Sequence, residues 1–245
     1  MKLTVLGKYG PYPKENGACS SYLLETGDKK ILIDCGNGCL SRLQQTISLF
    51  EIDAIFLSHL HYDHVSDLFI LRYALEGFKA RGMEPNLPLP LYMPGAPQTI
   101  ADLFKTSSAF DVKTVADNTK VRLDELKITF KEMTHPVSSF AVRFETEGKV
   151  FVYSGDTNMN DAIVPFAKNA DFLLMEAGLL ARDKKDNSAP HVSVKEAGMI
   201  GAQACVKRLL ITHIYPLYGE DEILTELKGQ FLQGEIAQEN NTYEI

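Results

Sequence analysis

The sequence has few cysteines, and their spacing does not suggest a disulfide framework. Four occur in 245 residues, and none is part of a Cys-x-x-Cys pair. No export signal accompanies them, so we expect reduced thiols rather than disulfides. The interpretation we favour for all four is that of small buried hydrophobic side chains: Cys19, Cys35, Cys39 and Cys205.

Long apolar runs are also missing. No stretch approaches the roughly 18 apolar residues that a membrane helix needs. Residues 1–7, Met-Lys-Leu-Thr-Val-Leu-Gly, are too short for a signal peptide and have the pattern of a first strand. We therefore expect a cytoplasmic protein with no membrane partner.

Positive charge is scarce. The chain has 25 Lys and Arg against 32 Asp and Glu, a formal net charge of −7. Nucleic-acid binders usually show a basic patch, whereas the short cluster at residues 182–185 is better interpreted as a solvated loop. The acidity gives no support to a large RNA footprint. It does not exclude phosphate chemistry, because bound dications would locally favour an anionic substrate.

What is present is a regular alternation of strand-like and helix-like segments without a linker. The length suits one α/β or α+β domain over residues 1–245. Strands are predicted at 2–7, 21–26, 30–34, 53–58, 90–93, 111–115, 121–131, 139–146, 149–154, 171–175 and 208–212. Helices are predicted near 38–49, 65–80, 96–107, 158–168, 193–204 and 220–230, the fifth opening on a Ser193/Glu196 capping box.

The most informative motif is His-Leu-His-Tyr-Asp-His, at residues 59–64. It follows the apolar run 54–57, so the metal-competent side chains emerge where a buried strand ends. His59 and His61 can point to one side of an extended chain, whereas Asp63 and His64 can serve a second ion. Imidazoles with a carboxylate suit zinc or a similar divalent metal.

The remaining histidines lie in comparable places. His135 and His213 each follow a strand-like run, which favours a ligand role over a structural one. His191 lies in the polar stretch 187–191, just before the capping box. Gly36-Asn37-Gly38 lacks a phosphate-loop pattern and is interpreted as a strand-to-helix turn, and Ser154 lacks the Gly-x-Ser-x-Gly context of a serine hydrolase.

These motifs together resemble the metallo-β-lactamase fold superfamily. The stations appear in order: residues 58–64, His135, Gly155-Asp156-Thr157 and Thr212-His213. Within the superfamily, residues 190–197 and 208–214 are similar to the ribonuclease Z branch. Met175-Glu176-Ala177-Gly178 resembles that branch's His-Glu-Ala-Thr motif, with Met175 and Gly178 as departures at its outer positions.

The resemblance implies a four-layered αββα sandwich, a homodimer and a dinuclear centre, with zinc as first choice of metal and manganese as second. One ion would take His59, His61 and His135, and the other Asp63, His64 and His213. Asp156 would bridge them, since a carboxylate has two oxygens to share. The resemblance also implies that Asp34 lies beside the ligands and orients them.

The chemistry expected of such a centre is hydrolysis by a metal-bridging hydroxide. Asp63 would orient this nucleophile or accept its proton. His191 would donate a proton to the leaving group, and the resemblance implies that Glu176 orients His191.

One departure bears on the substrate. In ribonuclease Z a long arm that grips transfer RNA lies between the third and fourth motifs, here His135 and Asp156. The 21 residues from one to the other (156 − 135) are used by two predicted strands and a turn at Glu147-Gly148, so no arm fits. We therefore expect a phosphodiesterase or ribonuclease Z-like enzyme acting on a small diester or RNA. The alternatives are a small-molecule hydrolase of this fold, acting on a cyclic phosphodiester, lactone or thioester, and a metal-binding protein without catalysis.

Overall fold

The computed structural model describes residues 1–83, 87–186 and 188–245, whose strands form two sheets. In spatial order the first sheet consists of β14 (Thr242–Glu244), β1 (Lys2–Gly7), β2 (Ser21–Thr26), β3 (Lys29–Ile33), β4 (Ala54–Phe56), β5 (Leu89–Pro94) and β6 (Phe110–Val115). The second consists of β13 (Glu235–Ile236), β12 (Arg208–Thr212), β11 (Phe172–Glu176), β10 (Lys149–Tyr153), β9 (Ser139–Thr146), β8 (Leu126–Met133) and β7 (Lys120–Leu123).

Strand side chains alternate between two cores, as the period of two in a strand requires. In β3, Ile31 and Ile33 face the core between the sheets, whereas Leu32 faces the opposite side. The core between the sheets is rich in aromatic side chains, among them Phe56, Phe130 and Phe144. Both faces of each sheet are therefore covered.

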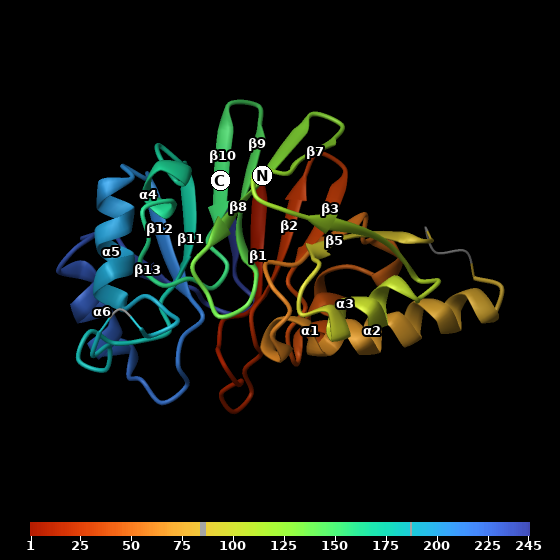
Figure 1. Cartoon of the computed structure of the whole chain (residues 1–245), viewed down its shortest axis with the longest axis horizontal. Helices are drawn as coiled ribbons and strands as arrows, with labels where there is room; N and C mark the ends of the chain where they lie inside the picture. Colours follow the sequence, from red (N-terminus) through yellow and green to blue (C-terminus); the bar gives the residue numbers. More distant parts are fainter. Residues whose placement is uncertain (84–86, 187) are drawn as a thin grey trace.

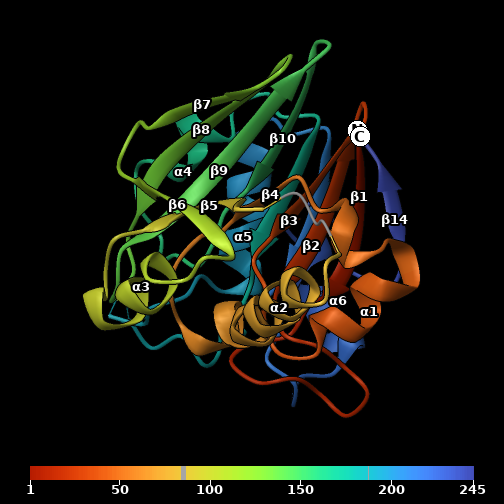
Figure 2. The ribbon, with the colours of Figure 1, turned by 90° about the vertical axis from the view of Figure 1, so that its right-hand side faces the viewer.

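Helices supply the outer layers. On the first sheet pack α1 (Cys39–Thr46), α2 (Tyr62–Ala80), α3 (Gln98–Lys105) and the short 3₁₀ helix η1 (Leu49–Glu51); on the second pack α4 (Ile163–Phe166), α5 (Val194–Gln203) and α6 (Glu220–Lys228). Figures 1 and 2 show the two helical layers on opposite outer sides of the paired sheets. This confirms the predicted αββα sandwich. No helix of the described chain is long and apolar enough to cross a membrane.

Strand direction gathers the functional loops at one edge. β3, β4 and β5 run parallel, as do β10, β11 and β12. The segments that follow β4, β10 and β12 carry residues 59–64, Asp156 and His213 respectively. Because carboxyl ends of parallel strands share one edge of a sheet, each sheet brings donors to the same edge of the sandwich.

Several predicted elements were wrong in detail. The strand expected at 121–131 is a hairpin of β7 and β8, because Asp124 turns the chain with φ of +51°. The helix expected at 158–168 is reduced to α4, because Asn160 Oδ1 accepts from the amides of Ala162 and Ile163 and holds a turn before it. Residues 38–49 divide into α1 and the start of η1, and the two-residue β13 and three-residue β14 were not predicted.

The cysteine prediction also needs a correction. Cys19, Cys35 and Cys39 are buried free thiols, as expected, but Cys205 is exposed. It lies in the turn after α5 with φ of +53°, which directs the chain across the surface toward β12. Ser193 and Glu196 form the predicted capping box at the start of α5.

Candidate metal centre

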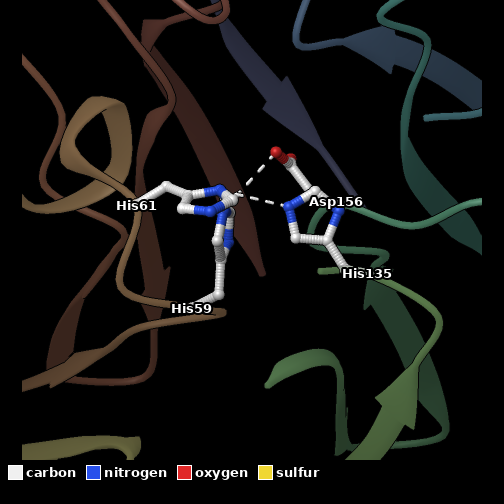
Figure 3. A group of neighbouring side chains, drawn as sticks. All are labelled: His59, His61, His135 and Asp156. Carbon is white, nitrogen blue, oxygen red and sulfur yellow. Dashed lines mark hydrogen bonds and ion pairs between the residues drawn. The ribbon is translucent and has the colours of Figure 1, made fainter. Parts of the chain in front are cut away.

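Three imidazoles and a carboxylate form a first donor set. His59 Nε2 and His135 Nε2 each lie 3.1 Å from His61 Nδ1, and Asp156 Oδ2 lies 3.5 Å from His59 Nε2. Figure 3 shows these four side chains converging, with His59 and His61 on one segment and His135 and Asp156 on two others. One donor atom from each lies within 4.8 Å of the others, the spacing of groups that can hold a single ion.

A second donor set lies beside the first. His213 Nε2 is 3.2 Å from both Asp63 Oδ2 and Asp156 Oδ2, and His64 Nε2 is 3.4 Å from Asp156 Oδ2. The donor atoms of Asp63, His64 and His213 again lie within 4.8 Å of one another. The structure therefore places the first two histidines of the motif in one set and its last two donors in the other.

The donors fit a metal better than they fit one another. His64 Nε2 and Asp156 Oδ1 are buried, and among the described residues neither has a hydrogen-bond partner. A buried polar atom left without a partner costs free energy. Divalent ions held by imidazole and carboxylate donors would satisfy both atoms.

The second ring nitrogen of three donors is fixed by the surrounding protein. Ser58 Oγ lies 3.1 Å from His59 Nδ1, and Asp34 Oδ2 lies 2.8 Å from His64 Nδ1. The carbonyl of Pro190 accepts from His135 Nδ1 at 3.1 Å. Such partners hold a metal-binding imidazole in one tautomer and one orientation.

Asp34 connects several segments around the donors through hydrogen bonds. Its carboxylate is buried and accepts hydrogen bonds from the Ser58 amide and hydroxyl and from the Tyr153 hydroxyl, at 2.7–2.8 Å. Since Tyr153 ends β10, this carboxylate joins the two sheets directly beneath the donors. The orienting place expected for Asp34 agrees with these contacts.

Burial and neighbouring charges set the protonation of the donors. Burial lowers the pKa of His59 well below its ordinary value, and burial also lowers the pKa of His61 and of His135. Burial opposes ionisation of Asp156, but the surrounding histidines, His213 first, hold its pKa well below the usual range. Neutral imidazoles and an ionised carboxylate are the forms that bind metals. His64 differs: burial opposes its protonation, but the nearby carboxylates, Asp156 first, raise its pKa well above the ordinary value, so a metal bound there would displace a proton.

His191 stands beside the second set. Its Nδ1 lies 3.1 Å from Glu176 Oε1 and 3.9 Å from Asp156 Oδ2. Although burial opposes protonation, the Glu176 carboxylate dominates and raises the pKa of His191 to about 9. Glu176 is itself fixed by the amides of Thr157 and Gly178. The Glu176 carboxylate therefore orients His191 and favours its protonated form, which is the form that a proton donor needs.

Close packing around the donors includes residues that sequence reasoning missed. A Cβ built on Gly10 would lie 2.0 Å from His213 Nε2, and one built on Gly36 would lie 2.1 Å from the Asp63 carbonyl oxygen. Hydrogen bonds of Ile214 with Lys8 and Gly10 hold the first of these segments in place. Gly10 lies in no recognisable motif, and Gly36 was interpreted only as part of a strand-to-helix turn, so the three-dimensional contacts are needed to show how each glycine packs against the donors.

Comparison with known proteins supports the same conclusion. The beta-lactamase superfamily domain matches residues 29–214. The chain is 35% identical over 241 residues to the probable metallo-hydrolase YhfI of Bacillus subtilis (strain 168), with 96% of each chain covered. The crystal structure of the metallo-beta-lactamase fold protein YhfI superposes with a TM-score of 0.91, at 31% identity, covering 100% of this chain and 98% of that one.

More distant relatives are similar over the whole chain. The ribonuclease Z of Methanothermobacter thermautotrophicus is 24% identical over 302 aligned positions, covering 100% of this chain and 97% of its own. The human tRNase Z short form has the same fold, with a TM-score of 0.79 at 21% identity over 100% of this chain and 99% of that one. The chain therefore belongs to the metallo-β-lactamase superfamily, as a metallo-hydrolase with distant sequence similarity to ribonuclease Z.

Proposed function

We propose that the protein is a dinuclear metal-dependent phosphodiesterase. The observation that carries this proposal is the position of Asp156, whose carboxylate lies against both donor sets and whose Oδ1 has no partner among the described side chains. A shared carboxylate of this kind suits two divalent ions held side by side.

We assign one ion to His59, His61 and His135 and the other to Asp63, His64 and His213, with Asp156 common to both. The imidazole-rich set favours zinc, with manganese as the second choice. When bound, such ions provide a hydroxide nucleophile near neutral pH and offset the charge that develops on a phosphoryl oxygen.

The other roles belong to the chain itself. Asp63 Oδ2 faces the centre, where it can orient the nucleophile or take up its proton. His191, held by Glu176, has its second ring nitrogen available for a leaving alkoxide. Proton donation there lets the leaving group depart as a neutral alcohol. This helps most with alkyl phosphodiesters, whose alkoxide is a poor leaving group.

Two other functions stay open within this fold. A small-molecule hydrolase acting on a cyclic phosphodiester, lactone or thioester needs the same donors. A proton donor at His191 favours phosphodiesters over a thioester, because a thiolate leaves without protonation more readily than an alkoxide does. A metal-binding protein without catalysis would not require the His191–Glu176 pair. That pair therefore favours an enzyme over a sensor or assembly partner.

The surface supports a small substrate and a second copy of the chain. The segment between His135 and Asp156 is occupied by β9, a turn and β10, which leaves no room for an arm. Exposed apolar side chains on α2 and α3 (Ile70, Tyr73 and Leu103) offer a face for a homodimer. We propose a cytoplasmic homodimer that cleaves small diesters, with RNA as a poorer substrate.

The first test measures metal content and substrate class together. Protein purified without chelator, loaded with metal and desalted should hold about two ions per chain by elemental analysis. It should hydrolyse bis-p-nitrophenyl phosphate, and the same preparation is assayed with a cyclic nucleotide, a lactam, a lactone and a thioester. A stable content near zero or one ion contradicts the dinuclear centre, and activity confined to the lactone or thioester contradicts the phosphodiesterase.

A further inference from the structure

An apolar hollow adjoins the metal centre on the side of His61. It has a volume of about 220 Å³ and is lined by Leu60, His61, Tyr62, Pro97 and Ile100. We refer to these five residues as the shelf. Tyr62 opens α2, and Pro97 and Ile100 belong to the start of α3, so two helices meet at this edge of the centre.

Tyr62 is the unusual member of the shelf. It stands between His61 and Asp63, which face the two donor sets, yet 70% of its own surface is exposed. Its backbone is held because it opens α2 next to the donors. An aromatic ring kept in water at this point has a face available for a ligand.

The chemistry of the shelf limits what it can hold. None of its five residues is Lys, Arg, Asp or Glu, so it offers no counter-charge to a phosphate chain or an ammonium group. The tyrosine and proline rings present flat apolar surfaces. The volume is below the roughly 300–1,000 Å³ of common ligand pockets, which suits one planar ring system rather than a chain of them.

We propose that the shelf binds the nucleobase of a nucleotide diester, with Tyr62 stacking on the base, so that Tyr62 determines specificity. The inference rests on the proposed phosphodiesterase function and names its substrate class. Because His61 belongs to both the shelf and a donor set, a diester at the donors has one substituent beside the shelf. Stacking on an aromatic ring tolerates any base, so a broad preference for nucleotides is expected.

The test compares two phosphodiesters with the same leaving group. They are the p-nitrophenyl ester of thymidine 5′-monophosphate and methyl p-nitrophenyl phosphate, which has no base. We expect the wild-type protein to favour the first. In Tyr62→Ala the ratio of the two kcat/KM values should fall by about 5- to 150-fold, the size of one lost base–aromatic stack, mainly through KM.

Two further variants make the result specific. Tyr62→Phe keeps the ring and should retain the wild-type ratio. Leu232→Ala removes an apolar side chain that is 79% exposed and lies outside the shelf, and it should leave both substrates unchanged. Equal losses on both substrates, a Phe variant as poor as the Ala variant, or the same effect from Leu232→Ala would each overturn the proposal.

A third substrate tests whether the shelf requires a planar substituent. Cyclohexylmethyl p-nitrophenyl phosphate has an apolar substituent that is not flat. If it is cleaved as well as the nucleotide ester, and is equally sensitive to Tyr62→Ala, the shelf holds any apolar group and the nucleobase assignment is wrong. A clear preference for the nucleotide ester supports the assignment.

The outcome is separable from the proposed function. If the metal-loaded wild-type protein cleaves neither ester, the phosphodiesterase is wrong, and the shelf is judged by calorimetric titration with thymidine 5′-monophosphate. Binding that is 5- to 150-fold weaker in Tyr62→Ala still supports the shelf. Equal binding by the two proteins, or none by either, overturns it.

Discussion

At the scale of single residues, we assign metal binding to some side chains of the centre and proton transfer to others. The geometry around His191 is compatible with either role, metal ligand or proton donor. It is paired with Glu176, but one of its nitrogens also lies within 4.8 Å of donor atoms of Asp156 and His213. A substitution there distinguishes the two roles.

We expect His191→Ala to lower kcat on a cyclic nucleotide, whose leaving group is an alkoxide, by about 10²–10⁴-fold, the usual contribution of a general acid or base. Metal content, measured by elemental analysis, should stay at the wild-type value. His59→Ala is the comparison, because it should lose both metal and activity. Loss of an ion from the His191 variant would show that His191 is a ligand.

Gly10 gives a prediction of a different kind. Its place against His213 leaves no room for a Cβ, so Gly10→Ala must displace the imidazole. A ligand moved by about 1 Å can cost 10²-fold in rate, and we expect at least that loss together with a reduced metal content. Gly219→Ala is the matched control, because a Cβ there meets nothing within 4 Å among the described residues. Wild-type activity and metal content in Gly10→Ala would contradict the packing argument.

The sequence predicted all seven donors, whereas the residues that support them were largely hidden. The donors follow strand ends in recognisable motifs, and the structure brings them together. Ser58 lies in the motif at residues 58–64, but the sequence did not predict its hydrogen bond to His59, nor the hydrogen bond from Tyr153 to Asp34. The Pro190 carbonyl could not be foreseen, because a backbone oxygen has no sequence signature. Assignment of the seven donors as metal ligands stays a prediction until metal is measured.

At the scale of helices and strands, a capping motif predicted where a helix begins better than the hydrophobic pattern predicted how long an element is. The capping box placed the start of α5 correctly because its two hydrogen bonds lie within four residues. The start of α2 was predicted three residues late, at 65, because residues 62–64 form its first turn as well as carrying donors; the amide of His64 already bonds to the His61 carbonyl. The pattern at 121–131 is strand-like throughout, so it could not show the turn at Asp124.

The capping box predicts a measurable stability effect. The Ser193 hydroxyl accepts from the Glu196 amide, and the Glu196 carboxylate accepts from the Ser193 amide. Ser193→Ala should therefore lower the free energy of unfolding by about 1 kcal/mol, within a usual range of about 0.5–2. Urea unfolding measures this. Ser41→Ala, which removes an exposed hydroxyl bonded to the Gly38 carbonyl, should cost less than about 0.5 kcal/mol; equal costs would contradict a capping role.

At the scale of the whole molecule, the centre links two halves. His59, His61, Asp63 and His64 follow the first sheet, whereas His135, Asp156 and His213 follow the second. The layering itself became clear only through the resemblance, because alternation of strands and helices fits several α/β arrangements. A site that joins the sheets should also contribute to the stability of the whole chain.

Removal of metal should therefore lower the melting temperature. An ion present at about 100 times its Kd stabilises the folded state by about 2.7 kcal/mol, which for a chain of this size corresponds to roughly 5–10 °C. Differential scanning calorimetry before and after chelation measures the change, and re-addition of zinc should reverse it. Asp156→Asn is the control, since its melting temperature should respond much less to the chelator. No change in the wild-type protein would contradict a shared metal centre.

Substrate size is also a property of the whole molecule. Backbone attraction supplies much of nucleic-acid affinity, and a net charge of −7 without an arm gives little of it. We expect small diesters to be cleaved readily and precursor transfer RNA poorly, as measured by kcat/KM for both at the same low salt. A much larger kcat/KM for precursor transfer RNA would require another gripping surface.

The carboxylate of Asp34 has a consequence for how such a molecule can change over evolutionary time. It serves a donor, its own sheet and the facing sheet together, so most substitutions there would damage folding and catalysis at once. Tyr62 and Pro97 do not join the two sheets in this way, and both line the shelf beside the donors. Related proteins can therefore diverge in the substrates that they bind while Asp34 and its contacts stay the same. A designer who seeks a new substrate can vary the shelf and should keep Asp34.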